Sequence, residues 1–368
     1  MRPLLAILPA LAMLPAWSQK TTPEEKHKEE LKKDVELGKE YTVEIEKNLK
    51  ISDDKSLTDR VQRVGSELAA IANATQVQGI YGDSRLNAFE YVFKVVKDDD
   101  VNAFSVPGGF VYVNSGLLKD VESDDELAAV LAHEIAHASH RHLITLTKER
   151  NKVDLLTLPL ILAAVLGQSR EAGNLVMTQQ LLSTALTSGW SEKAELDSDK
   201  TGFAYILKSK YHPVAMLTFM ERLAFKERRN SAKIDWGIYR THPPSRKRVD
   251  ALHALLQAAD VPVARSKVTT SYRVTVTAVE GKSTLKFGDT VLFVLEGADA
   301  AARAEALVPK LNEFFDSSPK MFSIRLLGEK LVWHGRPLVE LHSGDTAPAE
   351  ALANIKKSLF SLDYRTGG

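Results

Sequence analysis

Two histidines four positions apart, His133 and His137, constrain this chain more than any other feature of its sequence. Positions i and i+4 lie on the same face of an α-helix, one turn apart, so both imidazoles can reach a single Zn²⁺ ion. Glu134 follows the first histidine directly, where its carboxylate can act on a water molecule beside the metal. The motif therefore predicts a zinc site with hydrolytic chemistry on a helix.

The residues before the motif predict that helix independently. Ser123-Asp124-Asp125-Glu126 has the pattern of a capping box, and Leu127, Val130 and Leu131 follow at helical spacing. An accidental match on a solvated helix would more often lack such an apolar face. The context therefore favours the metal site over a chance match.

A catalytic zinc site needs a third protein ligand, which here must be His, Asp or Glu because the chain contains no cysteine. His140 lies on the same helical face, but seven residues place it roughly 10.5 Å from His133 along the axis, too far for bonds of about 2 Å. We therefore expect His140 and His142 to be surface or packing residues. His212, which precedes a proline, is expected to be a turn residue.

An acidic cluster downstream offers better candidates. Glu195 and Asp199 are again four residues apart at the start of a second helical pattern, so one can bind metal while the other supports a ligating histidine. Taken alone, the cluster would be read as an acidic helix N-terminus, which the helix dipole favours. Beside the two histidines, the metal role is the stronger interpretation.

Three motifs in this order resemble the zinc metallopeptidases of peptidase family M48. They are His133-Glu134-x-x-His137, Glu195-x-x-x-Asp199, and Thr241-His242-Pro243-Pro244 with Arg248, and the segment from Asn102 to Val113 is similar to the family's segment before the active-site helix. The resemblance covers roughly residues 31–256. Two departures, Asp197-Ser198 where Glu-Ala is usual and His212 where an acidic residue is often found, concern the subfamily and not the presumed ligands.

The resemblance implies a division of roles. His133, His137 and Glu195 would hold one Zn²⁺ per chain, Asp199 would orient a ligating imidazole, and Glu134 would be the general base. His242 and Arg248, carried over from the family motif, would stabilise the developing oxyanion or close the site. The strand Phe110, Val111, Tyr112 and Val113 would bind an extended peptide at an exposed sheet edge, the alternative being an ordinary core strand.

The first eighteen residues have the pattern of a signal peptide. Arg2 gives a short positive region, Leu4–Leu14 an apolar region, and Ala16-Trp17-Ser18 a cleavage signal, so the mature chain is expected to begin near Gln19. We therefore expect a periplasmic or secreted protein and leave membrane association open. The apolar residues 155–166 are too few to span a bilayer and could form a buried helix, a lid over the cleft or a membrane-dipping segment.

Periodicity predicts an α+β protein with two domains after the signal peptide (1–18): a mainly helical domain with a small sheet (19–262) and a smaller α+β domain (263–368). The resemblance implies that the first of these is a gluzincin-like HExxH domain. Helical patterns cover residues 23–50 and 57–71, and alternation predicts strands at 89–95 and 110–113. In the second domain the expected order is ββαβββα. His334 and His342 are isolated there, so an interaction or substrate-presenting role is expected, with an unknown partner.

These features predict a zinc metalloendopeptidase that cleaves exported or misfolded polypeptides in envelope quality control, with peripheral membrane or envelope-protein contact left open. Lysine plus arginine and aspartate plus glutamate number 48 each, so no overall charge favours nucleic acid. One alternative is a chaperone-like protein that binds envelope clients and holds latent or structural zinc. A second is a zinc hydrolase that acts on a non-peptide bond.

Overall fold

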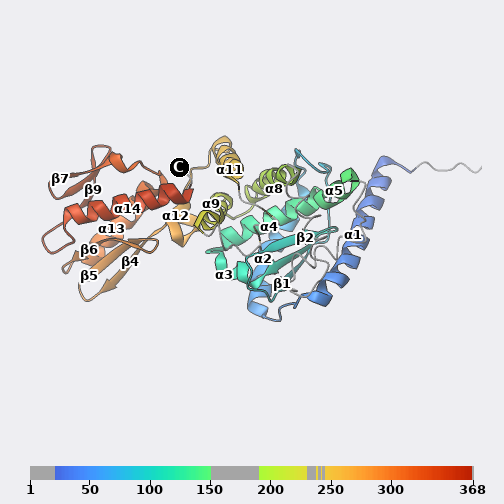
Figure 1. Cartoon of the computed structure of the whole chain (residues 1–368), viewed down its shortest axis with the longest axis horizontal. Coiled ribbons are helices and arrows are strands. Elements are labelled where there is room, and N and C mark those ends of the chain that lie inside the picture. Colours follow the sequence, from blue (N-terminus) through green and yellow to red (C-terminus); the bar gives the residue numbers. More distant parts are fainter. Residues whose placement is uncertain (1–20, 151–189, 230–237, 239–241, 243–244, 367–368) are drawn as a thin grey trace, which may run out of the picture.

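The computed structural model describes residues 21–150, 190–229, 238, 242 and 245–366. The predicted signal peptide and the apolar segment 155–166 lie outside these residues. The described elements form two bodies arranged along the long axis of the molecule (Figure 1). The predicted α+β class is confirmed, because both bodies combine helices with small sheets.

The first body is a three-stranded sheet surrounded by helices. Its elements are α1 (Pro23–Asn48), α2 (Lys55–Ala74), β1 (Val92–Val96), β2 (Ala103–Val106), β3 (Phe110–Asn114), α3 (Ser115–Asp120), α4 (Asp124–Ser139), α5 (His142–Arg150), α8 (Trp190–Ile206), α9 (Val214–Arg229), α11 (Arg246–Ala258) and α12 (Arg265–Val268). The two helices and the second strand predicted between residues 23 and 113 are confirmed, the first strand begins at Val92 and not at residue 89, and β2 was not predicted.

The sheet has the order β1-β3-β2, with β3 parallel to β1 and antiparallel to β2. One face packs on α1, where Tyr41 and Ile45 join the stacked rings of Phe104 and Tyr112. The prediction that residues 110–113 form an exposed edge is wrong, because β3 is the central strand and pairs on both sides. The alternative of an ordinary core strand is correct.

Helix α4, which carries the two histidines, is the buried centre of this body and packs against α2, α8, α9 and β2. It begins as predicted, because the Ser123 side chain accepts a hydrogen bond from the Glu126 amide. The Glu126 carboxylate accepts from the amide of Glu122, one residue before the expected partner. The capped N-terminus and the apolar residues packed around α4 therefore fix the orientation of the motif.

The second body contains η1 (Thr270–Tyr272), β4 (Val274–Val279), β5 (Lys282–Phe287), β6 (Thr290–Glu296), α13 (Ala300–Asp316), η2 (Met321–Ser323), β7 (Ile324–Leu327), β8 (Lys330–Trp333), β9 (Arg336–Glu340) and α14 (Pro348–Thr366). Two sheets of order β4-β5-β6 and β7-β8-β9 pack with α13 and α14. The predicted order ββαβββα omitted β5. Its buried face consists of Ser283, Leu285 and Phe287, and the polar Ser283 weakens the apolar alternation.

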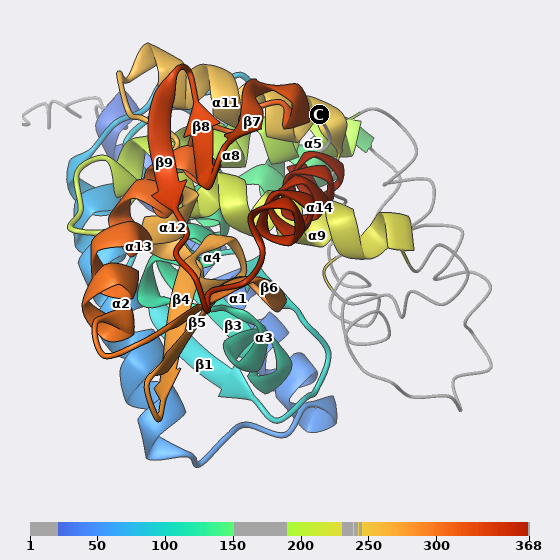
Figure 2. The same cartoon turned by 90° about the vertical axis from the view of Figure 1, so that its left-hand side faces the viewer.

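Each body has its own hydrophobic core, one reaching Val268 and the other beginning at Tyr272. The predicted boundary after residue 262 stays a prediction, although α12 packs on the first core. At the junction α14 lies beside α9 (Figure 2), and the rings of Phe225 and Tyr364 meet edge to face at 5.8 Å. The Arg265 guanidinium forms two bonds to Glu221.

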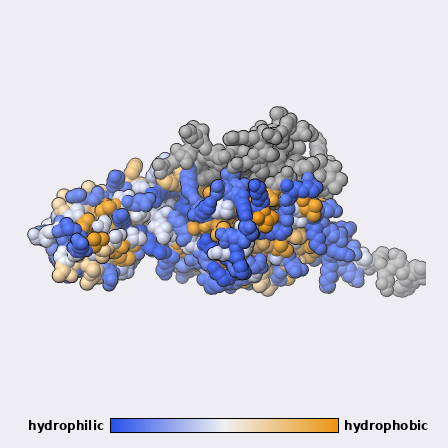
Figure 3. Space-filling view, turned by 90° about the horizontal axis from the view of Figure 1, so that it is seen from below, coloured by the Kyte–Doolittle hydropathy of each residue, from blue (hydrophilic) through white to orange (hydrophobic). Residues whose placement is uncertain are grey.

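Within the described part of the chain, no helix is long and apolar enough to cross a membrane. The face shown in Figure 3 carries mostly hydrophilic residues over the first body, with apolar residues scattered among them.

Candidate metal centre

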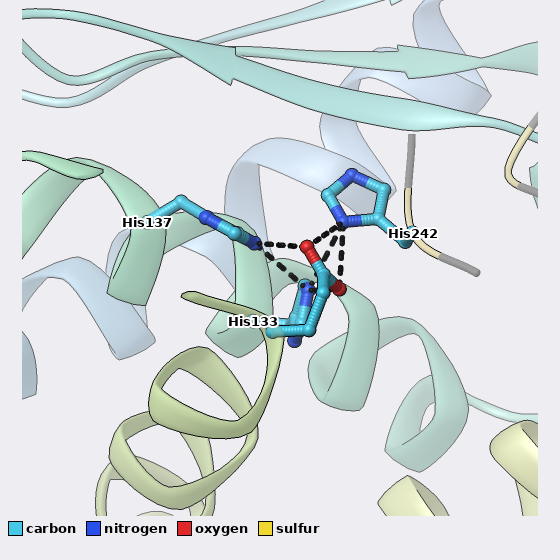
Figure 4. Close-up of side chains that lie close together, drawn as sticks. His133, His137 and His242 are labelled. Atoms are coloured by element: carbon cyan, nitrogen blue, oxygen red, sulfur yellow. Dashed lines mark hydrogen bonds and ion pairs between the residues drawn. The ribbon is translucent and has the colours of Figure 1, made fainter. Parts of the chain in front are cut away.

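Four side chains from α4, α8 and the segment before α11 bring possible metal ligands together: His133, His137, Glu195 and His242. The Nε2 atoms of His133 and His137 lie 3.1 Å apart, and they lie 3.2 and 3.3 Å from the Glu195 carboxylate oxygens. Nδ1 of His242 lies 3.2 Å from His133 Nε2 and from both oxygens. Figure 4 shows the three imidazoles converging on this carboxylate.

The separations between these ligand atoms fit a small metal ion with tetrahedral coordination. Ligands bound to zinc at about 2.0–2.1 Å stand about 3.3–3.4 Å from one another at tetrahedral angles. The observed separations of 3.1–3.3 Å are close to that value, and imidazole nitrogen with carboxylate oxygen is a donor set that zinc accepts. The residues present therefore fit a bound divalent metal ion.

Asp199 and Arg248 bond to members of this cluster and hold them in place. His133 donates from Nδ1 to the Asp199 carboxylate at 3.0 Å, which turns Nε2 toward the other ligands. Arg248, buried on α11, donates to both oxygens of Asp199 at 2.7 Å and lies 2.9 Å from Glu195. Gly202 lets α8 approach closely, since a Cβ there would lie 3.1 Å from the α4 backbone at Ala132.

Burial and charge act against each other on the pKa values of these groups. Burial disfavours the His133 imidazolium, but the carboxylates of Glu195 and Asp199 outweigh it and raise the pKa of His133 to about 9. Burial lowers the pKa of His137 well below its ordinary value. Burial would raise the pKa of Glu195, but His242 and Arg248 hold it well below its ordinary value. Glu195 is therefore an anion ready to bind a cation.

Glu134 points toward the ligand cluster from the same helix. Its Oε1 lies 3.2 Å from His242 Nε2, and its Oε2 accepts a hydrogen bond of 3.2 Å from the Ser105 hydroxyl. The carboxylate is 2% exposed and is anchored on both oxygens. Glu134 is thus held beside the position where a reacting group would meet the metal, whereas Ser105 is a contact that the sequence analysis missed.

A second buried cluster lies against the first and was not foreseen. His140, His142 and Asp197 are all buried, and their side chains contact one another and His137. The surface position considered for both histidines is therefore wrong, whereas the alternative of packing residues agrees with their burial. The rejection of His140 as a ligand beside His133 also agrees with this arrangement. The sequence contained one signal for this second cluster, because Asp197 lies in the same acidic segment as Glu195 and Asp199.

The outer edge of the sheet lies beside Glu134. Asn114 donates to the carbonyl of Asn102, so residues of even number on β2 bond to β3, and the backbone groups of Ala103 and Ser105 point outward. The same edge is already used at Val101, whose carbonyl accepts from Ile238. An extended chain could therefore continue this pairing along Ala103 and Ser105.

Comparison with known proteins agrees with these motifs. A family profile described as Peptidase family M48 matches residues 54–256, more than half of the chain. The chain is 30% identical over 223 residues to the beta-barrel assembly-enhancing protease of Yersinia pestis, covering 58% of this chain and 42% of that protein. It is also 30% identical over 178 residues to the mitochondrial metalloendopeptidase OMA1 of Schizosaccharomyces pombe, covering 48% and 50%.

A third relative, the metalloprotease LoiP of Escherichia coli, is 27% identical over 215 residues, which cover 55% of this chain and 81% of that protein. The match to the Yersinia protein spans less than half of its length. The matched residues 54–256 include every residue of the metal cluster, Glu134 and Arg248. The chain belongs to peptidase family M48.

Proposed function

We propose that the protein is a zinc metalloendopeptidase. One observation carries the proposal: His133, His137 and Glu195 converge at ligand spacing with the anchored carboxylate of Glu134 beside them. A purely structural metal site has no use for a general base at that place. The proposed ion is zinc because imidazole and carboxylate ligands from an HExxH helix are typical of catalytic zinc sites.

Zinc held by these residues would polarise the scissile carbonyl and lower the pKa of a water molecule. Glu134 accepts the proton of the attacking water and passes it to the leaving amine, a role that contributes about 10²–10⁴-fold to rate. Ser105 keeps the Glu134 carboxylate aimed at the site. Asp199 and Arg248 hold His133 and Glu195 in the orientation needed for binding.

His242 has to leave its observed place before a substrate can react. A catalytic zinc site keeps one position open for water or substrate, whereas Nδ1 of His242 stands 3.2 Å from its neighbouring ligand atoms. Of the two roles predicted for His242, closing the site is therefore the one this geometry supports. Its Nε2 also contacts Glu134, so its departure frees the base at the same moment.

The substrate is proposed to be an extended polypeptide that adds to the sheet at β2. Backbone hydrogen bonds to Ala103 and Ser105 would place a peptide bond next to Glu134, with little dependence on sequence. This replaces the predicted strand Phe110–Val113, whose backbone is already paired. The outward-pointing backbone groups of Ala103 and Ser105 beside the metal cluster also favour peptide over non-peptide substrates.

The names of two relatives support a role in envelope protein quality control. One is the beta-barrel assembly-enhancing protease of Yersinia pestis, and the other is the metalloprotease LoiP of Escherichia coli. We propose export by the predicted signal peptide and a periplasmic location. The competing proposal is a chaperone-like binding protein whose metal is structural. The placement of Glu134 favours the enzyme.

The test compares the wild-type protein with Glu134→Gln and Glu195→Gln. Glu134→Gln should retain about one zinc per chain and lose at least about 10²-fold in casein hydrolysis, whereas Glu195→Gln should also lose zinc. Metal analysis and circular dichroism accompany each assay. Equal turnover in wild type and Glu134→Gln would refute the peptidase and leave the binding protein as the better hypothesis.

A further inference from the structure

Behind the metal cluster, α5 and α8 bring together three buried polar side chains that the proposed reaction does not use. His142 begins α5, Asp197 lies within α8, and His140 caps the end of α4. They are 4%, 0% and 2% exposed, respectively. Buried polar groups of this kind are costly unless they are fully bonded, so each contact is informative.

These contacts form a chain that ends on a metal ligand. Nδ1 of His142 lies 3.0 Å from Nδ1 of His137, and Nε2 of His142 lies 3.0 Å from Oδ2 of Asp197. The hydroxyl oxygen of Ser198 also lies 3.3 Å from His142 Nδ1. His142 is therefore placed between the back of His137 and a buried carboxylate.

Chemistry fixes the direction of every hydrogen in this chain. Nε2 of His137 faces the other ligands and must be unprotonated to bind metal, so His137 carries its hydrogen on Nδ1 and donates it to His142. His142 then accepts at Nδ1 and carries its own hydrogen on Nε2, which it donates to Asp197. A carboxylate can only accept, so the chain has one consistent polarity.

Asp197 is held in place by groups besides His142. Its Oδ1 accepts from the backbone amides of Ile80 and Tyr81, and its Oδ2 accepts from Nδ1 of His140. Burial alone would raise the pKa of Asp197, but its bonds to His140 and His142 lower it. The carboxylate is thus a fixed anion and not a freely rotating one.

The loop that covers this cluster depends on two glycines. A Cβ on Gly79 would lie 2.8 Å from Asp197 Oδ1, and a Cβ on Gly82, where φ is +80°, would lie 2.6 Å from His142 Cδ2. The backbone therefore closes directly over the two side chains. This contact excludes water from the chain and preserves its internal bonds.

We propose that His142 and Asp197 are positioning residues that fix His137 as an Nε2 ligand of the metal. This inference rests on the proposed metal centre. Both imidazole ligands of α4 are then oriented by carboxylates of α8: His133 directly by Asp199, and His137 through His142 by Asp197. Partners of this kind orient metal-binding histidines and change metal affinity by about 10–100-fold when they are lost.

A second metal ion in the cluster of His140, His142 and Asp197 is the main alternative. The geometry opposes it, because both histidines approach the same oxygen and His140 Nδ1 stands only 2.5 Å from it. Two ligands of one zinc ion would stand about 3.3 Å apart. Two backbone amides also occupy the other oxygen.

The test uses three variants of the full chain. His142→Leu removes the acceptor, whereas His142→Asn keeps an oxygen close to the position of Nδ1. His140→Asn is the matched control, because it changes the other imidazole on Asp197, keeps a donor and does not touch His137. Zinc affinity is measured by competition with a chromophoric chelator, after circular dichroism has confirmed folding without metal.

We expect His142→Leu to bind zinc about 10–100-fold more weakly than the wild type, and His140→Asn to remain within about threefold. His142→Asn should lose less affinity than His142→Leu, because it keeps the acceptor for His137 and lacks only the bond to Asp197. Nitrogen-15 NMR of the zinc-loaded wild type should show the hydrogen of His137 on Nδ1 and that of His142 on Nε2. This measurement decides the proposal even if His142→Leu does not fold.

Three results would overturn the positioning role: unchanged affinity in folded His142→Leu, the opposite tautomer of His142, or a second zinc ion that His140→Asn removes. A wild-type protein that binds no zinc would instead refute the proposed metal centre. The two failures are therefore distinguishable.

Discussion

Replacing Arg248 by methionine is the most demanding test of how the metal cluster is built. Arg248 is 2% exposed and donates to both oxygens of Asp199 at 2.7 Å while standing 2.9 Å from Glu195. Methionine fills much of the same volume but carries no charge. In the metal-free protein the substitution leaves two buried carboxylates without their strongest partner.

Removing one partner of a buried ion pair costs about 3–5 kcal/mol of unfolding free energy. A Coulomb energy of about 4 kcal/mol for charges 4 Å apart, at an effective dielectric constant of about 20, has the same size. His133 has its pKa raised from 6.5 to about 9, so its stabilising charge is fully present below pH 6.5 and is lost as pH rises through 9. We expect a loss near 3 kcal/mol at pH 7, growing above pH 9.

The assay is urea unfolding of the full chain in the presence of a chelator, at pH 7 and at pH 9.5. Arg246→Met is the matched control, because Arg246 lies two residues earlier on α11 and forms an exposed pair with Asp250, with a contribution of about 0.3–0.5 kcal/mol. Added zinc should restore part of the loss by compensating Glu195. A loss below about 1 kcal/mol in metal-free Arg248→Met would refute the assigned charge balance.

Three further predictions concern the gate, the junction and the domain boundary. His242→Ala should keep zinc, since three ligands remain, and raise peptide turnover severalfold; a fall in turnover would favour oxyanion stabilisation. Burial would raise the pKa of Glu122, but bonds from Ser271 and Thr269 lower this pKa from 4.5 to about 2. Up to about 3 kcal/mol of unfolding free energy should therefore be present above pH 4.5 and be lost as the pH falls toward 2. Glu122→Gln should weaken this pH dependence in urea titrations. Arg265→Met should cost about 3–5 kcal/mol in the same assay, because buried Glu221 would keep only the histidine contact to His253 at 3.6 Å. A chain ending near residue 259 should therefore be less stable than one ending at residue 269, and equal stability would contradict the pairing.

The sequence determined the parts of this protein that depend on short-range spacing. The i, i+4 geometry of a helix is enough to place His133 and His137 on one face, and Glu134 beside them, whatever surrounds the helix. The same rule made Glu195 and Asp199 candidates for a ligand and its support. The amphipathic helices before residue 75 and the turn at Pro107 were likewise encoded locally.

Only the tertiary structure decided which side chains meet across the chain. Local alternation shows that Phe110–Val113 is a strand, but strand order depends on pairing between distant segments. The edge position of β2 in the described sheet could therefore not be read from the sequence. The burial of His142 and Asp197 depends on α5, α8 and the glycine loop meeting over residues that are 55 positions apart. Helix geometry fixes what lies on one face, whereas packing fixes what that face touches. For this reason the proposed ligands could be predicted from the sequence, whereas the fold decided which residues support them.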